Sequence, residues 1–394
     1  MEKQYLTEGN MSKLEELIQQ YCPDGVEWKT LGEVCDIHKG AQFNKTDMKE
    51  VGTYPVINGG INPSGYAEVF NEGKNTITIS QGGASAGYVN FLRNKFWLGA
   101  HCYAVTPYDT VLNKYLYHFI KMNEITLQQC QYGAGIPALA KSTISSLEIP
   151  VPPLPVQEEI VRILDVFTEL QAELHAELQK RLQQYNYYRD NLLSFEGRTD
   201  VQWKKLNEVA TVYDGTHQTP AYKESGIPFI SVENIGNIYN SRKYISREDF
   251  DKYKIKPRMG DVFMTRIGSI GVCAVFEKQA DIAYYVSLAL IRPNQDAVNS
   301  RYLKHIIESL TGCKELKKRT LVNAVPIKVN KDDIGKIVLP FPSLAEQQKI
   351  VSILDRFDTL TTDLTQGLPA EIEKRRQQYE YYRDKLLTFK RKGA

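Results

Sequence analysis

An internal duplication constrains the fold of this 394-residue chain more than any other feature of its sequence. The segment QQYNYYRDNLLSF at residues 183–195 returns as QQYEYYRDKLLTF at residues 377–389. Upstream, QEEIVRILDVFTEL begins at Gln157 and returns as QQKIVSILDRFDTL from Gln347. Agreement over this length is not coincidence and is the signature of a repeated structural unit.

Two further landmarks extend the repeat. A proline-rich turn precedes each copy of the helical segment, at residues 150–155 and 340–342. The sequence VEWKTLGEVCDI around Trp28 also returns as VQWKKLNEVATV around Trp203. The order along the chain is therefore variable region, helix, variable region, helix.

The repeated segments are predicted to be long helices that pair as a coiled coil. Proline is tolerated in the first turn of a helix and disfavours helix just upstream, so the proline-rich turns suit helix starts. Apolar residues spaced three and four apart form the stripe that seats one helix against another. In the first copy these residues are Ile160, Ile163, Phe167, Leu170 and Leu174. A plain helical dimerisation arm has the same periodicity and stays an alternative.

The two helices differ in length by one four-residue unit. The first contains the tandem tetrads QAEL, from Gln171, and HAEL, from His175, and four extra residues in a heptad pattern make a stutter. The copies lie 190 residues apart before this point and 194 after it, so the second arm is expected to be ~6 Å longer at ~1.5 Å per residue. Gly367 and Pro369 interrupt the second copy, which predicts a kink or a short break near Leu368.

The two variable regions, about residues 28–149 and 203–339, share little obvious sequence. Runs such as NTITIS in the first and DVFMTRIG in the second are rich in β-formers, and turns of Gly, Pro and Asn separate such runs. Each variable region is therefore predicted to be mixed, mainly β with a few helices.

Composition excludes several classes of protein. Hydrophobic residues make up 42% of the chain, and no stretch approaches the ~20 apolar residues that span a bilayer. The charged N-terminal segment lacks the apolar core of a signal peptide, so we expect a cytoplasmic protein with no membrane role. The six cysteines form no C-x-x-C pair, which argues against a zinc or redox motif. A net charge of +2 means that a nucleic-acid partner would be met by local basic patches.

The repeated landmarks resemble the specificity subunit of type I restriction-modification systems over essentially the whole chain. The resemblance rests on the QQYxYYRDxLLxF helix ends, the proline-rich turns followed by QxxIVxILD, the tandem AEL tetrads and YCPDGVEWKTLGEV from Tyr21. It implies two target-recognition domains, each reading one half of a bipartite, asymmetric site in double-stranded DNA. It also implies helices that dock two modification (methyltransferase) subunits, with restriction (translocase/endonuclease) subunits joining the full complex. This chain would then be no enzyme and hold no metal, with S-adenosylmethionine, ATP and Mg²⁺ expected on the partner subunits.

The expected fold is α+β, with two mixed, mainly β target-recognition domains separated by two long helices that form an antiparallel coiled coil with pseudo-two-fold symmetry. Two dissimilar readers on such a frame suit a split, asymmetric target, as dimeric readers suit palindromes. One tetrad of ~6 Å compares with a rise of ~3.4 Å per base pair, so adding a tetrad is expected to widen the spacer by one or two pairs. The expected boundaries are an N-terminal helical segment at 1–27, target-recognition domains at 28–150 and 199–340, and helical spacers at 151–198 and 341–394.

Glycine-rich turns after two predicted strands are the first candidates for DNA contact. The turns SQGGASAGYV and TRIGSIGVCAV permit close backbone approach, and they are equally well explained as tight turns between strands. In the functional interpretation, Gln81 contacts an adenine edge and Arg266 a guanine edge. The candidate residues are Ser80, Gln81, Gly82, Gly83, Ser85, Tyr88, Arg266, Gly268 and Ser269.

Two polar loops and a basic run are further candidates. The loop YDGTHQTPAY from Tyr213 is rich in hydrogen-bonding groups, and GGINPSGY from Gly59 is its nearest counterpart in the first variable region. A lone histidine such as His217 also caps turns in many proteins. The basic run suits phosphate contacts or a solvated face equally. The candidate residues are Asn62, His217, Gln218, Thr219, Lys317, Lys318 and Arg319, with Lys314 beginning the run.

The aromatic helix ends YNYYRD and YEYYRD keep one pattern although the variable regions differ. Most of these side chains are expected to pack between helices. Because the same surface occurs twice, we also assign them to the docking of identical partner subunits, as the resemblance suggests. The candidate docking residues are Tyr185, Tyr188, Arg189, Tyr379, Tyr382 and Arg383.

Catalytic alternatives find no motif in this sequence. A stand-alone methyltransferase would need an F-x-G-x-G loop and a [DN]-P-P-[YF] clamp on a flipped base, and Asn62-Pro63 continues with Ser64. No G-x-x-x-x-G-K-[ST] phosphate loop is present. Asp24 and Glu27 of PDGVEWK superficially resemble a nuclease pattern, but they lie within one turn. A non-catalytic coiled-coil scaffold, such as a carbohydrate-binding β protein, would leave the repeated tetrads and tyrosines unexplained.

Overall fold

The structure is a computed structural model, which describes residues 8–133, 135, 137–362 and 367–393. The chain separates into two compact units. The first unit comprises residues 1–175 and 371–394, and the second comprises residues 176–370. The boundary between them falls inside the long helix α6 (Leu154–Leu192).

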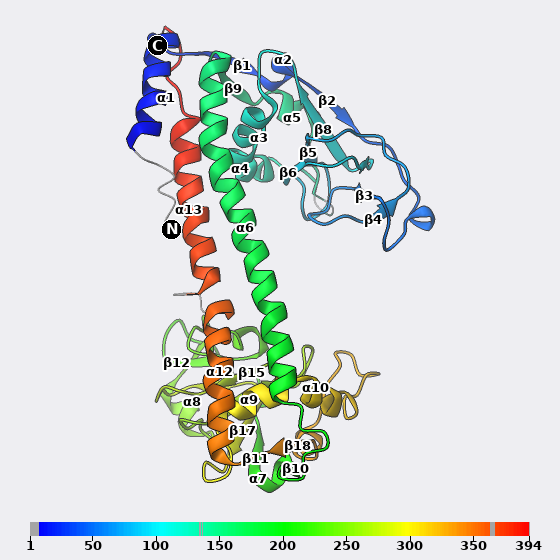
Figure 1. The fold of residues 1–394 in the computed structure, drawn as a ribbon, viewed down its shortest axis with the longest axis vertical. Coiled ribbons are helices and arrows are strands. Elements are labelled where there is room, and N and C mark those ends of the chain that lie inside the picture. Colours follow the sequence, from blue (N-terminus) through cyan, green and yellow to red (C-terminus); the bar gives the residue numbers. More distant parts are fainter. Residues whose placement is uncertain (1–7, 134, 136, 363–366, 394) are drawn as a thin grey trace. The chain divides into compact units, whose positions relative to one another are not determined.

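The first unit is built on a four-stranded antiparallel sheet, a three-stranded sheet and a separate strand pair (Figure 1). Strand β3 pairs with β7 in parallel, and the other pairings in this unit are antiparallel. In sheet order the strands are β2 (Cys35–Lys39), β8 (Cys102–Pro107), β5 (Thr76–Ser80) and β6 (Val89–Leu92); β4 (Gly65–Ala67), β3 (Tyr54–Ile57) and β7 (Trp97–Leu98); and β1 (Glu27–Thr30) with β9 (Glu148–Val151).

The second unit repeats this topology strand for strand, although the two sequences share little. Strand β12 pairs with β16 in parallel, as β3 does with β7. In the same order, the strands are β11 (Ala210–Asp214), β17 (Leu288–Pro293), β14 (Val262–Thr265) and β15 (Cys273–Val275); β13 (Tyr244–Ile245), β12 (Ile227–Ile230) and β16 (Ala283–Tyr284); and β10 (Gln202–Lys205) with β18 (Val338–Phe341). The prediction that both variable regions mix strands and helices is confirmed. The two regions also share one fold, because their strands are arranged in the same order.

Helices connect and cover these strands. The first unit contains α1 (Glu8–Tyr21), α2 (Leu31–Val34), α3 (Asn113–Met122), α4 (Glu124–Gln129), α5 (Lys141–Ser145) and α13 (Leu368–Leu386), with a 3-10 turn at Lys45–Asp47. The second contains α7 (Leu206–Val209), α8 (Arg247–Asp251), α9 (Ser300–Glu308), α10 (Leu310–Lys317), α11 (Lys331–Gly335) and α12 (Leu344–Thr362), with a 3-10 turn at Val232–Asn234. Within the described ranges, no helix combines the length and apolar character needed to cross a membrane.

The proline-rich segments are only partly turns, which corrects the sequence-based interpretation. Pro150 lies in β9 opposite Trp28, and Pro340 lies in β18 opposite Trp203. The strand pairs explain why the tryptophan and proline landmarks recur together, because each proline faces its tryptophan across a ladder. Helix α6 then begins with Pro155 in its first turn, as expected for a residue that lacks a backbone N–H donor.

A buried glutamine fixes each helix start. Gln157 is fully buried, and its Nε2 donates to the carbonyl oxygens of Pro152 at 2.7 Å and Thr110 at 3.0 Å. Gln347, also fully buried, donates to Pro342 at 2.9 Å and to Ala297 at 3.0 Å. The sequence repeat contained both residues, but only the structure reveals that they satisfy backbone groups near the helix start.

The expected interruption of the second helix agrees with the described part of this region. Helix α12 ends at Thr362 and α13 begins at Leu368, directly after a non-helical Gly367. Pro369 therefore occupies the first turn of α13, where its ring is tolerated. Residues 363–366, between these points, lie outside the described residues.

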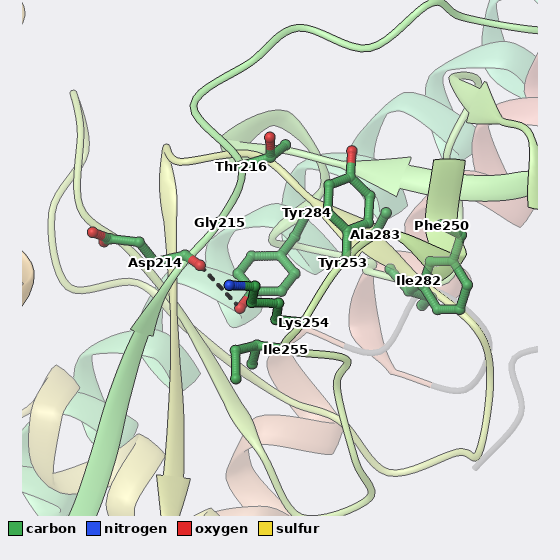
Figure 2. Close-up of a pocket in the computed structure, with 10 residues that line it drawn as sticks. All are labelled: Asp214, Gly215, Thr216, Phe250, Tyr253, Lys254, Ile255, Ile282, Ala283 and Tyr284. Atoms are coloured by element: carbon green, nitrogen blue, oxygen red, sulfur yellow. Dashed lines mark hydrogen bonds between the residues drawn. The ribbon is translucent and has the colours of Figure 1, made fainter. Parts of the chain in front are cut away.

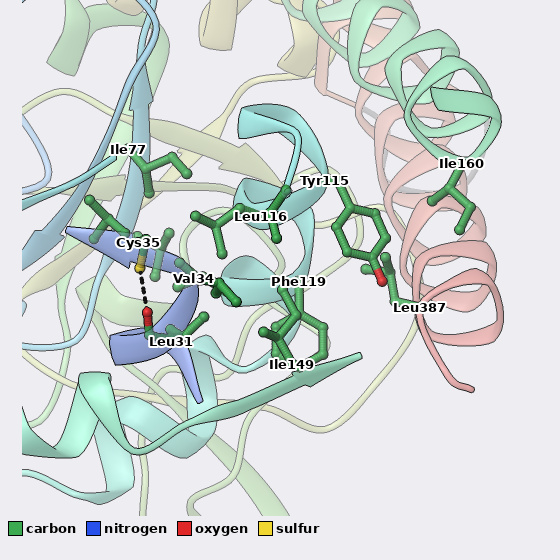
Figure 3. Packing of buried hydrophobic residues seen from close by; sticks show 14 of the residues in the cluster. Leu31, Val34, Cys35, Ile77, Tyr115, Leu116, Phe119, Ile149, Ile160 and Leu387 are labelled. Carbon is green, nitrogen blue, oxygen red and sulfur yellow. Dashed lines mark hydrogen bonds between the residues drawn. The ribbon is translucent and has the colours of Figure 1, made fainter. Parts of the chain in front are cut away.

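In the first unit, one hydrophobic core joins the sheet to the long helices. Tyr115 and Leu116 of α3 pack between strand residues such as Ile77 on one side and, on the other, Ile160 of α6 and Leu387, which directly follows α13 (Figure 3). Further along α6, Phe167 stacks on Tyr382. The contacts therefore move forward along α6 and backward along α13, so the first half of α6 and α13 are antiparallel neighbours. The second unit has an equivalent core, which includes Tyr185 of α6 and Leu354 of α12. In both units the β domain is thus fixed to a helix pair.

Candidate nucleic-acid interface

The glycine-rich turn of the first unit connects β5 to β6. Ser80 is buried at the end of β5, where its backbone N–H donates to Tyr88 O at 2.9 Å and its carbonyl accepts from Gly87 N at 2.8 Å. Gly87 has φ +86°, and a Cβ there would meet Gln128 N at 2.9 Å. Ser80 therefore closes the turn. The partly exposed Gly82, Gly83, Ser85 and Tyr88 stay candidates for contact.

The second unit contains the same turn between β14 and β15. Thr265 N donates to Val272 O, and Gly271 N donates to Thr265 O, both at 2.9 Å. Gly268 has φ +78°, close to the +80° of Gly83. Gly268 is partly exposed and Ser269 is exposed at the tip. The similar place expected for the two turns is therefore confirmed by their hydrogen bonds.

Arg266 is built into the second turn instead of projecting from it. Its side chain is nearly buried, forms an ion pair with Asp214, and donates through Nε to Val329 O at 3.1 Å. To contact guanine, Arg266 would have to leave Asp214, and a buried charge without its partner is costly. This placement favours Arg266 as a positioning residue and does not support its expected base contact.

Gln81 occupies the equivalent position in the first unit. Its backbone N–H donates to His101 O at 2.9 Å and its carbonyl accepts from Leu139 N at 2.7 Å. Arg266 makes the same two backbone bonds, to Ser287 O and from Val329 N, both at 3.0 Å. The Gln81 side chain is half-buried, so the two units differ in chemistry at one structurally matched position.

A second loop accompanies each glycine-rich turn, and it was not predicted from the sequence. In the second unit, residues 321–328, named finger 2, form a hairpin in which Leu321 N donates to Lys328 O at 2.8 Å. Gly268 N donates to Ile327 O of finger 2 at 2.9 Å. In the first unit, Gly83 N donates to Pro137 O at 2.9 Å within residues 132–138, named finger 1. Residues 134 and 136 of finger 1 lie outside the described part of the chain.

The polar loop that follows β11 lies at the edge of a small cavity. Thr216 N donates to Tyr284 O at 3.1 Å, and the residues that follow, His217, Gln218 and Thr219, are exposed. The imidazole of His217 lies 3.9 Å from Asp214, so it has a carboxylate neighbour but no short hydrogen bond to it. The adjoining cavity has a volume of about 200 Å³. Figure 2 shows the Tyr284 ring among the residues that line it.

The expected counterpart of this loop in the first unit was wrong. Thr216 bridges Tyr285 in parallel, and the equivalent parallel bridge in the first unit joins Ala41 to Gly99. The counterpart is therefore the segment after β2, at residues 40–47, where Gln42 and Lys45 are exposed. The stretch from Gly59 connects β3 to β4, and Asn62 is exposed there. The two variable regions have diverged too far for loop composition to identify matching loops. The order of the strands identifies them.

The basic run at the end of α10 is partly neutralised. Lys318 and Arg319 both form ion pairs with the buried Glu315, and Arg319 also donates to Lys336 O at 2.9 Å. Burial alone would raise the pKa of Glu315, but these cations and a hydrogen bond from Val338 N lower it overall. Lys314 and Lys317 are exposed, and no ion pair involves either of them within the described ranges. The free positive charge of the run therefore lies at these two lysines.

Two of the predicted docking residues face inward. Tyr185 and Tyr379 are each 7% exposed, and their hydroxyls lie 3.2 Å and 2.9 Å from Nδ1 of His305 and His118. Buried in this way, Tyr185 and Tyr379 hold the β domains to the helices and present no surface to a partner. This placement does not support the expected docking role of these two tyrosines.

The other helix-end residues are more accessible. Tyr188 and Tyr382 stack on Phe357 and Phe167, with ring centroids 5.4 Å and 5.3 Å apart. Arg189 and Arg383 form ion pairs with the neighbouring Asp190 and Asp384. The sequence interpretation missed Tyr187 and Tyr381, which are 66% and 62% exposed. Their position two residues after the buried tyrosines was the available signal, because positions i and i+2 do not share a helix face.

Comparison with known proteins places this chain in a single family. The family described as the Type I restriction modification DNA specificity domain matches residues 23–184 and 199–374. The type I restriction enzyme EcoR124I/EcoR124II specificity subunit of Escherichia coli is 31% identical over 408 residues, covering 96% of this chain and 97% of the relative. A Haemophilus influenzae chain named as a type I restriction enzyme specificity subunit is 32% identical over 399 residues, covering 96% and 99%.

The fold has a counterpart among solved structures. The crystal structure of the type I restriction-modification system S subunit from M. genitalium superimposes with a TM-score of 0.60 at 20% identity. It covers 92% of this chain and 96% of the other. This likeness supports the α+β architecture of two domains joined by long helices.

Proposed function

This chain belongs to the type I restriction-modification DNA specificity subunits, and on that basis we propose that its two units read the two halves of one bipartite, asymmetric DNA site. One observation carries the proposal: the units share strand order and turn geometry, while the side chains at matched positions differ. Gln81 and Arg266 are one such pair. Because the two units share one fold, each can bring its turns to a DNA groove in the same way. Because the side chains on those turns differ, the two units are expected to recognise different base sequences. The specificity subunit recognises DNA and is not itself the catalytic component.

We place the two target-recognition domains at residues 28–150 and 199–340, with helical spacers at 151–198 and 341–394. The exposed residues of the glycine-rich turns, with Asn62, His217, Gln218 and Thr219, are proposed to face bases. Lys314 and Lys317, unpaired within the described residues, are proposed to face phosphates, with Lys318 and Arg319 beside them, although both of these are paired with Glu315. Phosphate contacts position a protein on the duplex, and base contacts give it sequence preference.

The duplicated helix ends are proposed to dock the same partner twice. Tyr187 and Tyr381 are exposed to nearly the same extent, and each makes an edge-on ring contact with the tyrosine that follows it. Exposed aromatic residues are frequent anchors of protein interfaces. Two modification subunits suit two equal surfaces, and restriction subunits would join this assembly. S-adenosylmethionine, ATP and Mg²⁺ are expected on those partners.

Mapping of methylated motifs tests this proposal most simply. The full chain is expressed with the modification subunit of its host, and modified positions are read by sequencing genomic DNA. We expect one split, asymmetric motif. Replacing residues 206–337 with the equivalent region of a relative should change one half of that motif and keep the other. A palindromic motif, or methyl transfer by the purified chain alone, would contradict the proposal.

A further inference from the structure

Finger 2 is held rigidly at its base. The backbone of Val329, the residue that follows finger 2, exchanges two hydrogen bonds with Arg266: Val329 N donates to Arg266 O at 3.0 Å, and Arg266 Nε donates to Val329 O at 3.1 Å. Arg266 is in turn fixed by Asp214. Together with the bond from Gly268 to Ile327, these contacts tie finger 2 to the glycine-rich turn. A loop held in this way presents its tip in a defined direction.

The tip of finger 2 is unusually apolar for an exposed loop. Val325 is fully exposed, and Val322 is 65% exposed. Leu321 and Ile327 are 43% and 40% exposed. Contiguous exposed apolar side chains on a fixed loop are typical of an interaction surface, because their contact with water is unfavourable and is removed when a partner covers them. The exposed tip of finger 2 therefore suits a binding partner that offers apolar groups.

One amide lies among these apolar side chains. Asn323 is exposed between Val322 and Ala324, and within the described part of the chain its side chain has no hydrogen-bond partner. An unused amide can donate one hydrogen bond and accept another from a single partner. The tip thus combines a bidentate polar group with apolar neighbours.

Positive charge flanks finger 2, and no acidic residue occurs within it. Lys328 ends the finger, and the free Lys314 and Lys317 lie on α10, which precedes it by a few residues. Cations that precede and end an apolar loop in the sequence suit a polyanion that also offers apolar groups. In the major groove of DNA the thymine C5-methyl group is that apolar group, and the adenine N6 and N7 atoms match an amide.

We propose that finger 2 enters the major groove and reads A·T base pairs in the half-site of the second unit. Val325 contacts a thymine methyl group, Asn323 contacts adenine, and the flanking lysines contact phosphates. Arg266 acts as a positioning residue that fixes the finger. This inference rests on the proposed function, since it assigns the base-reading residues of one DNA-reading unit.

Uracil-for-thymine substitution in the DNA tests the valine contact. The full chain in complex with its modification subunit is titrated with duplexes that carry its motif, with thymine or uracil at each position of the second half-site. The wild type should bind about fourfold more weakly when the contacted methyl group is absent, the ratio expected for one buried methyl-sized group. Val325→Ser should bind both duplexes equally, and Asn323→Ala should relax the adenine preference at least about fivefold.

A matched control is Val51→Ser, which makes the same change at an 82% exposed valine of the first unit. It should keep the thymine preference in the second half-site. An unchanged urea denaturation midpoint of Val325→Ser shows that the variant is folded. The proposal is overturned if Val325→Ser still binds the thymine duplex more tightly than the uracil duplex by the wild-type ratio. This includes the case in which the variant binds both duplexes more weakly by the same factor. Loss of modification-subunit binding with intact DNA preference also overturns it, because finger 2 would then be a protein-docking loop. A wild-type complex that binds no duplex at all would refute the proposed function itself.

Discussion

The hydroxyl of Tyr379 lies 2.9 Å from Nδ1 of His118, and both side chains are buried. Tyr379 belongs to helix α13 and His118 to α3, so this contact fixes a helix to the β domain of the first unit. Tyr185 and His305 make the equivalent contact in the second unit, at 3.2 Å. The tyrosine therefore occurs in both copies of the repeat because each unit uses it to hold a long helix against its β domain.

Removing the Tyr379 hydroxyl should weaken the first joint. Tyr379→Phe leaves buried His118 without its partner at Nδ1, and we expect the free energy of unfolding to fall by about 1–3 kcal/mol. Urea denaturation followed by fluorescence measures this change. Tyr381→Phe, at a 62% exposed tyrosine of the same helix, is the matched control and should change it little. Equal effects of the two substitutions would contradict the assignment.

The stability of the first unit should depend on pH through His118. Burial lowers the pKa of His118 below its ordinary value of 6.5, although Asp165 at 3.7 Å opposes this. The other groups that affect it are Tyr379, Lys114 and Arg383. With a lowered pKa in the folded state, the unfolded chain binds more protons, so stability is lost as the pH falls below about 6.5.

Between pH 7.5 and pH 5.5 this loss is at most ~1.4 kcal/mol, the value for one proton per pH unit. Denaturation midpoints of the wild type and of His118→Gln at the two pH values measure it. The variant should be less stable at both and should lack the part of the pH dependence that His118 causes. An unchanged pH dependence would show that His118 does not titrate in this window.

The ion pair between Asp214 and Arg266 should matter for both stability and recognition. Asp214→Ala leaves the nearly buried Arg266 without its partner, and we expect a loss of about 3 kcal/mol, toward the lower end for buried pairs because Asp214 is 30% exposed. Asp281→Ala removes the partner of the exposed Arg247 and should cost less than ~1 kcal/mol. Motif mapping of the two variants should reveal relaxed preference in the second half-site for Asp214→Ala alone. Similar losses in the two variants would argue against a positioning role for Arg266.

Tyr187 and Tyr381 should contribute to partner assembly more than to folding. Replacing either with Ala is expected to weaken binding of a modification subunit by about 1–2 kcal/mol, as for an aromatic anchor of moderate strength. Titration of the purified chain with that subunit, monitored by calorimetry, measures the affinity. Tyr108→Ala is the control, because Tyr108 is 51% exposed but lies outside the long helices. If Tyr108→Ala weakens assembly equally, the helix ends are not the docking surface.

Much of the fold could be predicted because the repeat is local in sequence. The landmarks at Gln157 and Gln347 located both helices, and Pro369 located the interruption. The role of Arg266 could not be predicted, since its burial depends on Asp214, which lies 52 residues upstream and reaches it only in the folded sheet. Finger 2 was missed because its apolar residues resemble those of a short buried strand. Only the structure reveals that Val325 is exposed.

Motif mapping after a tetrad insertion tests most directly whether the helices set the distance between two independent readers. Four residues, AEL preceded by one polar residue, are inserted after Leu178 of α6, and methylated motifs are mapped for the wild type and the variant. Both half-site sequences should be unchanged, and the spacer between them should widen by one or two base pairs, because four helical residues add ~6 Å against ~3.4 Å per pair. An active variant with the original spacer would contradict the account.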